Sequence, residues 1–567
     1  MNVASFESVL VRPRQSEQLP PCALGCATGA DIRGWIGVVA QRRKLGLWDA
    51  EALTRAWRMV TDVNPFPATL GRICPHPCEA GCNRAGKDGA VAINALERFL
   101  GDWGLRQRLG LQRLEKDPKP QSIGVIGAGP AGLSFAYQMA RRGYRVTVYE
   151  KNEKPGGMLQ YGIPEYRLPE DIVAAEVGRI LALGVELRLG TGIGRDISVS
   201  RLKAQHDILF LGIGALRARR LGIPGEDGGG VWSGTEYLAS INRGEPPALG
   251  AEVIVIGGGN TAIDAARTAR RAGARVTLLY RRTRQEMPAI AAEVEDALAE
   301  GVTLTMLVAP VRIHRTNARV SAIVVQQMTL GEPEASGRRR PVPVVGSEHE
   351  LPASAVIAAV SQEPDWEGLD GLAPGASWIE NAEQGRIDDR LWAGGDALGL
   401  GIAGIAIAGG RRAAEALHAR LRNHALPAST APTAIAASAL KPDFYCARPR
   451  AAVPEISGAD RLAAPEIEVR GTISEAQFLE EVERCFSCGL CFGCEQCFMY
   501  CNAGGFSRLE ERTPGTYFAL EHDACEGCRK CIELCPCGYL IAEPMVAGGA
   551  AQIRAAGPRP DRAPPST

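Results

Sequence analysis

Apolar residues recur at helical spacing in the first part of the chain. They mark three amphipathic segments, at 34–46, 49–63 and 92–103, which are joined by stretches rich in proline and cysteine. Farther along, 122–150 and 252–280 each show an apolar strand, a glycine turn, a helix and a second strand. The pattern predicts an α/β multidomain protein, with a helical N-terminal domain and two Rossmann-like nucleotide-binding domains.

The first glycine turn has the features of a dinucleotide site. A strand leads into Gly127-x-Gly129-x-x-Gly132, and Glu150 ends the next strand. The glycines permit a tight turn that brings a pyrophosphate to the N-terminus of a helix, and the carboxylate accepts hydrogen bonds from ribose hydroxyls. The alternative is a glycine-rich turn that binds no nucleotide. The strand before the turn, the helix after it and the acid at the end of the next strand favour the dinucleotide site.

The second turn differs at the position that reads the ribose. Its Gly257, Gly259 and Ala262 repeat the first turn, but Tyr280 stands in place of the acid, and Arg281 and Arg282 follow. Guanidinium groups bind a 2′-phosphate, whereas a carboxylate repels it. We therefore expect NADP(H) rather than NAD(H) here. The alternative is that both arginines are solvated surface charge.

The chain has 17 cysteines in two groups, with none between Asn83 and Tyr445. In a reducing cytosol such groups are metal ligands more often than disulfides. The C-terminal group resembles a bacterial two-cluster ferredoxin, in which each fourth cysteine binds the other cluster. One 4Fe–4S cluster would be held by Cys491, Cys494, Cys497 and Cys535, and the other by Cys525, Cys528, Cys531 and Cys501. A zinc ribbon is the alternative, and roles for Cys485, Cys488, Cys446 and Cys537 stay open.

Composition narrows the function further. Lys+Arg 64 balance Asp+Glu 64, which disfavours nucleic acid as a partner. No apolar run reaches the roughly 20 residues needed to span a bilayer, and the first residues do not resemble a signal peptide. We expect a cytoplasmic protein.

Several motifs together resemble the small (beta) subunit of glutamate synthase. They are GAGPAGL, KPGGMLQYGIPEYRLP, RLGIPGED, GGGNTAIDAARTA, YRRTRQEMPA and WAGGD, and they span about residues 20–420. The same motifs are similar to the large subunit of the ferredoxin:NADP oxidoreductase and to the N-terminal part of dihydropyrimidine dehydrogenase. One departure is GLGIAGIAIAGG, where relatives usually carry a Pro-Thr step.

The resemblance implies FAD in the first site and NADP(H) in a second, inserted domain. It places Gly156, Gly157, Met158 and Leu159 beside the isoalloxazine and Asp396 on the ribityl–pyrophosphate. The remaining cofactor-binding candidates are the motif neighbours Pro130, Ala131, Lys151, Gly214, Asn260, Thr261 and Gly395.

The N-terminal cysteines suffice for one 4Fe–4S cluster. They are Cys22, Cys26, Cys74, Cys78 and Cys82. By the family pattern Cys26, Cys74 and Cys78 are ligands, Glu97 is the candidate fourth ligand, and Cys82 is the runner-up. An ordinary exposed helix carboxylate is the alternative for Glu97. By the count of ligands we expect three clusters in all, one N-terminal and two C-terminal.

The expected domains follow in chain order. They are an iron–sulfur domain at 1–118, the FAD domain at 119–250 and 385–425, the NADP(H) domain at 251–384, a linker at 426–475, an α+β domain like bacterial ferredoxin at 476–545 and a disordered tail at 546–567.

These features favour an NAD(P)H-dependent FAD and iron–sulfur oxidoreductase, the electron-transfer subunit of a larger complex. The favoured partner is a 2-oxoacid:ferredoxin oxidoreductase. Alternatives are a glutamate synthase small subunit, a subunit that serves a sulfite-reductase-type enzyme, and, in another class, a non-catalytic electron-wiring scaffold. Intact glycines and Glu150 argue against the scaffold.

Overall fold

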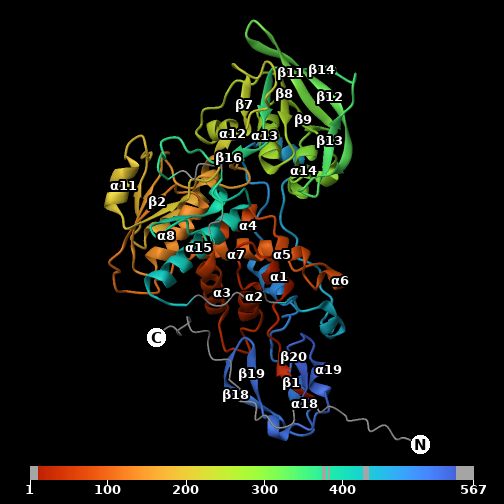
Figure 1. Ribbon diagram of the computed structural model, residues 1–567. Helices are drawn as coiled ribbons and strands as arrows, with labels where there is room; N and C mark the ends of the chain where they lie inside the picture. Colours follow the sequence, from red (N-terminus) through yellow and green to blue (C-terminus); the bar gives the residue numbers. More distant parts are fainter. Residues whose placement is uncertain (1–10, 373–377, 381–382, 426–432, 545–567) are drawn as a thin grey trace, which may run out of the picture. The chain divides into compact units, whose positions relative to one another are not determined.

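The computed structural model describes residues 11–372, 378–380, 383–425 and 433–544 (Figure 1). The chain divides into two compact units. The larger unit comprises 20–431 and 447–485, and the smaller unit comprises the described parts of 1–19, 432–446 and 486–567. The tail expected at 546–567 lies outside the described residues, as does the start of the expected linker.

The N-terminal part of the larger unit is helical, as predicted. Its helices are α1 (Pro21–Gly25), α2 (Ile32–Ala40), α3 (Asp49–Val63), α4 (Pro67–Ile73), α5 (Pro77–Ala80), α6 (Ala85–Asp88) and α7 (Ile93–Arg106). Helices α4 and α7 pack backbone to backbone, because a Cβ on Gly101 would lie 2.2 Å from the nitrogen of Ala68. This close packing fixes the helix that carries Glu97 against the loop that carries Cys74.

The first nucleotide-binding domain is built on a parallel five-stranded sheet in the order β17-β5-β2-β3-β4. The strands are β2 (Ser122–Ile126), β3 (Arg145–Tyr149), β4 (Glu186–Arg188), β5 (Ile208–Leu211) and β17 (Leu391–Ala393). Its helices are α8 (Pro130–Ala140), α9 (Met158–Tyr161), α10 (Glu170–Leu181), α11 (Val199–Gln205) and α15 (Ala403–Leu421). Helix α15 packs directly on α8, since a Cβ on Gly410 would lie 2.1 Å from the carbonyl oxygen of Ala131.

The second nucleotide-binding domain has its own parallel sheet in the order β10-β9-β8-β15-β7. It also has a second, antiparallel sheet of four strands. The parallel strands are β7 (Val231–Ser233), β8 (Glu252–Ile256), β9 (Arg275–Tyr280), β10 (Thr303–Met306) and β15 (Ala355–Ala358). The antiparallel strands are β11 (Val308–Thr316), β12 (Arg319–Pro333), β13 (Arg339–Pro343) and β14 (His349–Pro352). Helices α12 (Gly234–Asn242), α13 (Asn260–Arg271) and α14 (Ala291–Ala299) complete it.

The boundaries expected for this inserted domain, 251 and 384, need correction. Strand β7 pairs with β15 and so belongs to the inserted domain. The chain passes between the domains at the pair formed by β6 (Arg217–Ala218) and β16 (Gln362–Glu363), and Leu369 already packs in the core of the first domain. The three-residue β7 carries too little pattern to be found from sequence.

Much of the expected linker at 426–475 is folded. We call residues 447–485 the returning segment; it belongs to the larger unit and contains α16 (Gly458–Ala463) and α17 (Glu475–Val482). Phe478 and Val482 are fully buried in the core of the N-terminal helices, and the Phe478 ring stacks on Phe99 with centroids 4.4 Å apart. The last segment of the smaller unit therefore begins at 486, whereas the ferredoxin-like domain was expected from 476.

The smaller unit is an α+β domain, as expected, but it also recruits the start of the chain. Strand β1 (Val11–Gln15), expected within the helical domain, pairs antiparallel with β20 (Leu540–Pro544). The unit also contains a hairpin of β18 (Phe506–Thr513) and β19 (Thr516–Leu520) and the helices α18 (Gln496–Met499) and α19 (Lys530–Leu534).

Among the helices that the structure describes, none has the length and apolar character of a membrane span.

Candidate cofactor and cluster sites

A cavity opens at the carboxyl ends of β2, β3 and β5, and most residues expected for the first cofactor line it. They are Gly127, Gly129, Pro130, Ala131, Glu150, Lys151, Gly157, Met158, Leu159, Gly214 and Asp396. Gly132, Gly156 and Gly395 are not among the lining residues. The backbone nitrogen of Gly156 donates to the carbonyl oxygen of Ala128, within the glycine turn, at 2.8 Å.

The glycine turn of this site leaves no room for side chains at Gly127 and Gly132. Gly127 adopts a φ of +98°, and a Cβ on Gly132 would lie 2.0 Å from the Gly127 carbonyl oxygen. Side chains at these positions would push α8 away from the strand. With glycine, the first turn of α8 presents its backbone N–H groups to the cavity, which fits a dinucleotide pyrophosphate.

Glu150 is held by the turn that it faces. It is 5 % exposed, and its two carboxylate oxygens accept hydrogen bonds from the backbone nitrogens of Ala128 (2.8 Å) and Asn152 (3.0 Å). The side-chain nitrogen of Asn152 also donates to the oxygen that faces its backbone nitrogen, at 2.7 Å. The other oxygen, which accepts from Ala128, therefore retains a lone pair for a ribose hydroxyl. Burial raises the pKa of Asp396 to about 6, and its carboxylate accepts from the nitrogen of Gly401 at 3.1 Å. This donor and acceptor set fits FAD.

Sequence reasoning missed part of this cavity. Its lining also includes Asn152, Thr191, Gly192, Ile193, Ile213, Asp365, Glu367, Ile402, Ala403 and Ala406. Gly212 and Ile213 are the first two residues after β5, so the carboxyl-end position of that strand was a usable signal. Asp365 and Glu367 return from the second domain and belong to no recognisable pattern.

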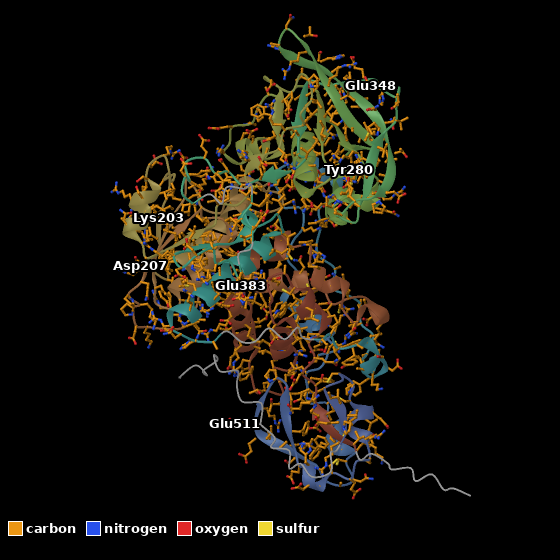
Figure 2. The ribbon with its side chains drawn as sticks, viewed as in Figure 1. Lys203, Asp207, Tyr280, Glu348, Glu383 and Glu511 are labelled. Carbon is orange, nitrogen blue, oxygen red and sulfur yellow. The ribbon has the colours of Figure 1, made fainter. Side chains whose placement is uncertain are left out.

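The second glycine turn lies between β8 and α13. Gly257 and Gly259 precede the helix, and Asn260, Thr261 and Ala262 form its first turn. The Asn260 side-chain oxygen accepts from the nitrogen of Ile290 at 2.9 Å. Tyr280, the last residue of β9, packs so closely that a Cβ on Gly258 would lie 2.3 Å from its ring (Figure 2).

The two arginines after β9 have different surroundings. Arg282 is 2 % exposed; its guanidinium donates to Glu334 at 2.8 Å and to the carbonyl oxygen of Arg339 at 2.7 Å. Arg281 is exposed, and burial of its stem and the charge of Arg282 lower its pKa. Arg281 is thus the arginine that solvent reaches, whereas Arg282 braces β12 and β13.

A second cavity gathers the N-terminal cluster candidates. Cys26, Cys74, Cys78 and Glu97 all line it, whereas Cys22 and Cys82 do not. Glu97 accepts a hydrogen bond from Asn64 at 2.9 Å, and burial raises the pKa of its carboxyl to about 7. Three thiols and a carboxylate around one cavity fit the ligand set expected for a 4Fe–4S cluster, and they favour Glu97 over Cys82.

The two cavities share the first turn of α15. Ala403 and Ala406 line the dinucleotide cavity, and Gly404 between them lines the cysteine cavity. A Cβ on Gly404 would lie 3.0 Å from the side chain of Ala27, directly after Cys26. The same turn of α15 therefore forms part of the wall of both cavities.

The thiols of the smaller unit sort into two sets. Burial raises the pKa of Cys497 to about 12, and the neighbouring thiols that add to this rise are Cys491, Cys494 and Cys535. Burial likewise raises the pKa of Cys531 to about 11, with Cys525, Cys528 and Cys501 as the contributing thiols. Cys501 and Cys535 thus each lie with the opposite group, as in a two-cluster ferredoxin.

Among the described residues, no group of three or more His, Cys, Asp or Glu side chains is arranged as the ligands of a single metal ion.

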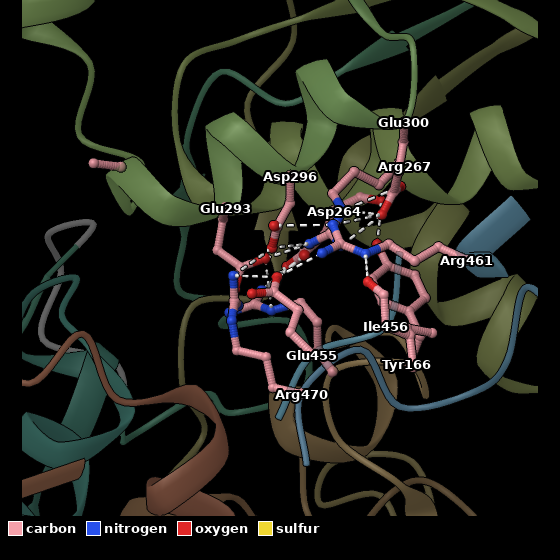
Figure 3. Close-up of polar contacts among 12 residues, drawn as sticks. Tyr166, Asp264, Arg267, Glu293, Asp296, Glu300, Glu455, Ile456, Arg461 and Arg470 are labelled. Carbon is pink, nitrogen blue, oxygen red and sulfur yellow. Dashed lines mark hydrogen bonds and ion pairs between the residues drawn. The ribbon is translucent and has the colours of Figure 1, made fainter. Parts of the chain in front are cut away.

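A buried ionic network joins the two nucleotide-binding domains to the returning segment (Figure 3). Arg167 of the first domain donates to both oxygens of Asp264 at 2.7 and 2.6 Å. Within the second domain Arg267 donates to Glu300 at 2.7 Å, and Arg470 of the returning segment donates to Glu293 at 3.0 Å. The hydroxyl of Tyr166 donates to the carbonyl oxygen of Asp264 at 3.4 Å. Tyr166 and Arg167 of the YGIPEYRLP motif are therefore interdomain contacts rather than cofactor ligands.

Comparison with known proteins agrees with this architecture. Residues 121–419 match the family described as pyridine nucleotide-disulphide oxidoreductase, and residues 15–109 match dihydropyrimidine dehydrogenase domain II, 4Fe–4S cluster. The beta subunit of the NADP(+)-dependent formate dehydrogenase of Moorella thermoacetica is 38% identical over 73% of this chain and 61% of its own length. The beta subunit of the NADPH-Fe(3+) oxidoreductase of Geobacter sulfurreducens is 40% identical over 61% of this chain and 51% of its own length.

The chain thus spans only about half to three fifths of these two relatives. The small chain of the NADPH glutamate synthase of Escherichia coli is covered far more completely, being 33% identical over 70% of this chain and 88% of its own length. The chain therefore belongs to the pyridine nucleotide-disulphide oxidoreductase family, within the group of the glutamate synthase small chains.

Proposed function

We propose that this chain is the electron-transfer subunit of a larger oxidoreductase complex and moves electrons between NADP(H) and 4Fe–4S clusters by way of FAD. The observation that carries the proposal is the shared turn of α15. Gly404 faces the cysteine cavity, and Ala403 and Ala406 face the dinucleotide cavity. An α-helix with its side chains is about 10–12 Å across, and these residues are small, so the two sites lie close together.

Bound FAD would accept a hydride and release electrons singly, which joins a two-electron donor to one-electron clusters. The protein's part is positioning. Glu150 and the α8 N-terminus would hold the adenosine and pyrophosphate, and Met158 and Leu159 would lie beside the flavin ring. Arg281 would bind the 2′-phosphate of NADP(H).

We propose three 4Fe–4S clusters, one held by Cys26, Cys74, Cys78 and Glu97, and two in the smaller unit. For the partner we propose an enzyme of the 2-oxoacid:ferredoxin oxidoreductase type. The sorting of the smaller unit's thiols into two ferredoxin-like sets supports a partner that exchanges single electrons. The many clustered thiols favour a reducing cytoplasm as the location.

Anaerobic titration with NADPH tests the proposal. The purified chain should carry FAD and lose its yellow colour on addition of NADPH. A protein that lacks flavin, or whose flavin does not bleach with NADPH or NADH, would instead be the non-catalytic scaffold.

A further inference from the structure

Helix α12 of the second nucleotide-binding domain connects the two nucleotide sites. Its first residue, Gly234, packs against the second glycine turn, since a Cβ on Gly234 would lie 3.0 Å from the side chain of Thr261. Its last residue, Asn242, contacts the chain around α9 in the first domain. A helix of nine residues spans roughly 13 Å. One helix therefore runs from the expected NADP(H) turn to the wall of the expected FAD cavity.

The side-chain amide of Asn242 caps the end of α9 from the other domain. Its nitrogen donates to the carbonyl oxygens of Gln160 at 3.0 Å and Ile163 at 2.9 Å. An amide nitrogen carries two N–H groups, so it makes both bonds at once. The last carbonyl groups of a helix lack partners within it, and α9 ends at Tyr161. Asn242 therefore holds the end of α9 at two points.

The two carbonyl groups flank a close contact in the cavity wall. Met158 and Ile163 both line the first cavity. The Met158 side chain lies against the backbone of Gly162, since a Cβ on Gly162 would lie 2.1 Å from the Met158 methyl carbon. Gly162 stands between the two residues that Asn242 holds. A shift of this short segment would therefore move Met158 and Ile163 in the cavity wall.

An independent contact already joins the two domains. The buried pair of Arg167 and Asp264 joins them through two hydrogen bonds between charged groups. The bonds from Asn242 are made by a neutral amide that is only partly buried. Neutral hydrogen bonds contribute less to stability than charged ones. Loss of the Asn242 amide should therefore leave the domains assembled and release the end of α9.

We infer that Asn242 is a positioning residue for hydride transfer, which fixes the flavin-side wall relative to the domain that binds NADP(H). In this reaction the hydride of NADPH, one proton with two electrons, passes to FAD, and NADP⁺ remains. The rate of such a transfer depends steeply on the distance and orientation of the reacting atoms. The inference rests on the proposed function, because it takes FAD and NADP(H) as the two cofactors.

Asn242→Asp in the full-length chain tests the inference. Aspartate has the same shape, but its carboxylate has no hydrogen to donate to the two carbonyl oxygens. We expect the limiting rate of flavin reduction by NADPH to fall by about tenfold to a hundredfold in rapid mixing. The NADPH concentration that gives half of that rate should stay nearly unchanged, because Arg281 is untouched. Asn423→Asp makes the same chemical change at an exposed position and should change neither quantity.

The oxidised protein gives a second readout that needs no NADPH. Asn242→Asp should shift the visible absorption bands of the bound FAD, and Asn423→Asp should not. FAD content reports whether the variants fold. If Asn242→Asp does not fold, Asn242→Ala removes both donors without adding a charge and should show the same slower rate and shifted bands.

The outcomes separate this inference from the proposed function. If NADPH does not reduce the flavin of the unmutated chain, the proposed function fails, and the absorption bands alone still test the position of the wall. Folded Asn242 variants that match Asn423→Asp in limiting rate and absorption would overturn the inference. A loss of stability with an unchanged limiting rate would overturn it too, because Asn242 would then be only a structural contact between the domains.

Discussion

Arg461 of the returning segment donates a hydrogen bond to Asp296 of α14 at 3.0 Å, and both side chains are buried. Arg470 donates to the other oxygen of Asp296 at 2.7 Å. The returning segment thus secures the second nucleotide-binding domain, although Arg461 and Asp296 are 165 residues apart in sequence.

Replacing Arg461 by alanine should therefore destabilise the second domain. Removing one partner of a buried ion pair costs about 3–5 kcal/mol, because the other charge stays buried without its partner. Arg448→Ala is the matched control: its pair with Glu483 is exposed on both sides and contributes about 1 kcal/mol or less. Chemical denaturation compares the two. Equal effects would show that the buried network does not hold the domain.

Arg281→Gln should weaken NADPH binding much more than NADH binding. A lost charged hydrogen bond to the 2′-phosphate is worth about 1.5–3 kcal/mol. Arg282→Gln should act mainly on stability, because that guanidinium is engaged with Glu334. Steady-state kinetics with both nucleotides measure the difference. A preference for NADH in the unmutated chain would remove the 2′-phosphate assignment.

Glu97→Gln should change the spectrum or the potential of the N-terminal cluster while FAD stays bound. The amide lacks the negative charge that a carboxylate ligand would supply. Cys82→Ser should leave this cluster's own signal in place, since Cys82 does not line its cavity. Low-temperature spectroscopy of the reduced N-terminal cluster in both variants shows which residue is its fourth ligand. The reverse pattern would make Cys82 the fourth ligand.

Two truncations should behave differently. A chain of residues 20–485 contains the described larger unit and should still reduce an artificial dye with NADPH, while electron exchange with the partner is lost. A chain that ends at residue 474 also loses Phe478 and Val482 from the helical core. Losing one buried phenylalanine costs about 3–5 kcal/mol, so the shorter chain should unfold more readily. Equal thermal stability would contradict the packing of the returning segment.

The local motifs were predictable from sequence because their chemistry is local. Gly127, Gly132 and Glu150 lie within one continuous strand–turn–helix–strand segment, so their spacing alone predicts a dinucleotide site there. The opposite grouping of Cys501 and Cys535 was predictable for the same reason, since the ferredoxin spacing carries it.

Features that depend on distant segments were not predictable. The pairing of β1 with β20 and the burial of α17 join parts of the chain that are hundreds of residues apart. Arg281 and Arg282 are neighbours in the sequence, which gives no reason to assign them different roles. In the structure Arg282 is buried and donates to Glu334, directly after β12, whereas Arg281 is exposed. The range 426–475 was expected to be a linker, but it contains the arginines that hold α14.

The most direct test of the account is rapid anaerobic mixing with NADPH, followed by optical and low-temperature spin measurements on one sample series. The account predicts that the flavin bleaches first and that reduced 4Fe–4S signals then appear, beginning with the cluster that Glu97→Gln alters. Flavin that bleaches while every cluster stays oxidised, although dithionite reduces the clusters in the same preparation, would contradict electron transfer from FAD through the α15 turn.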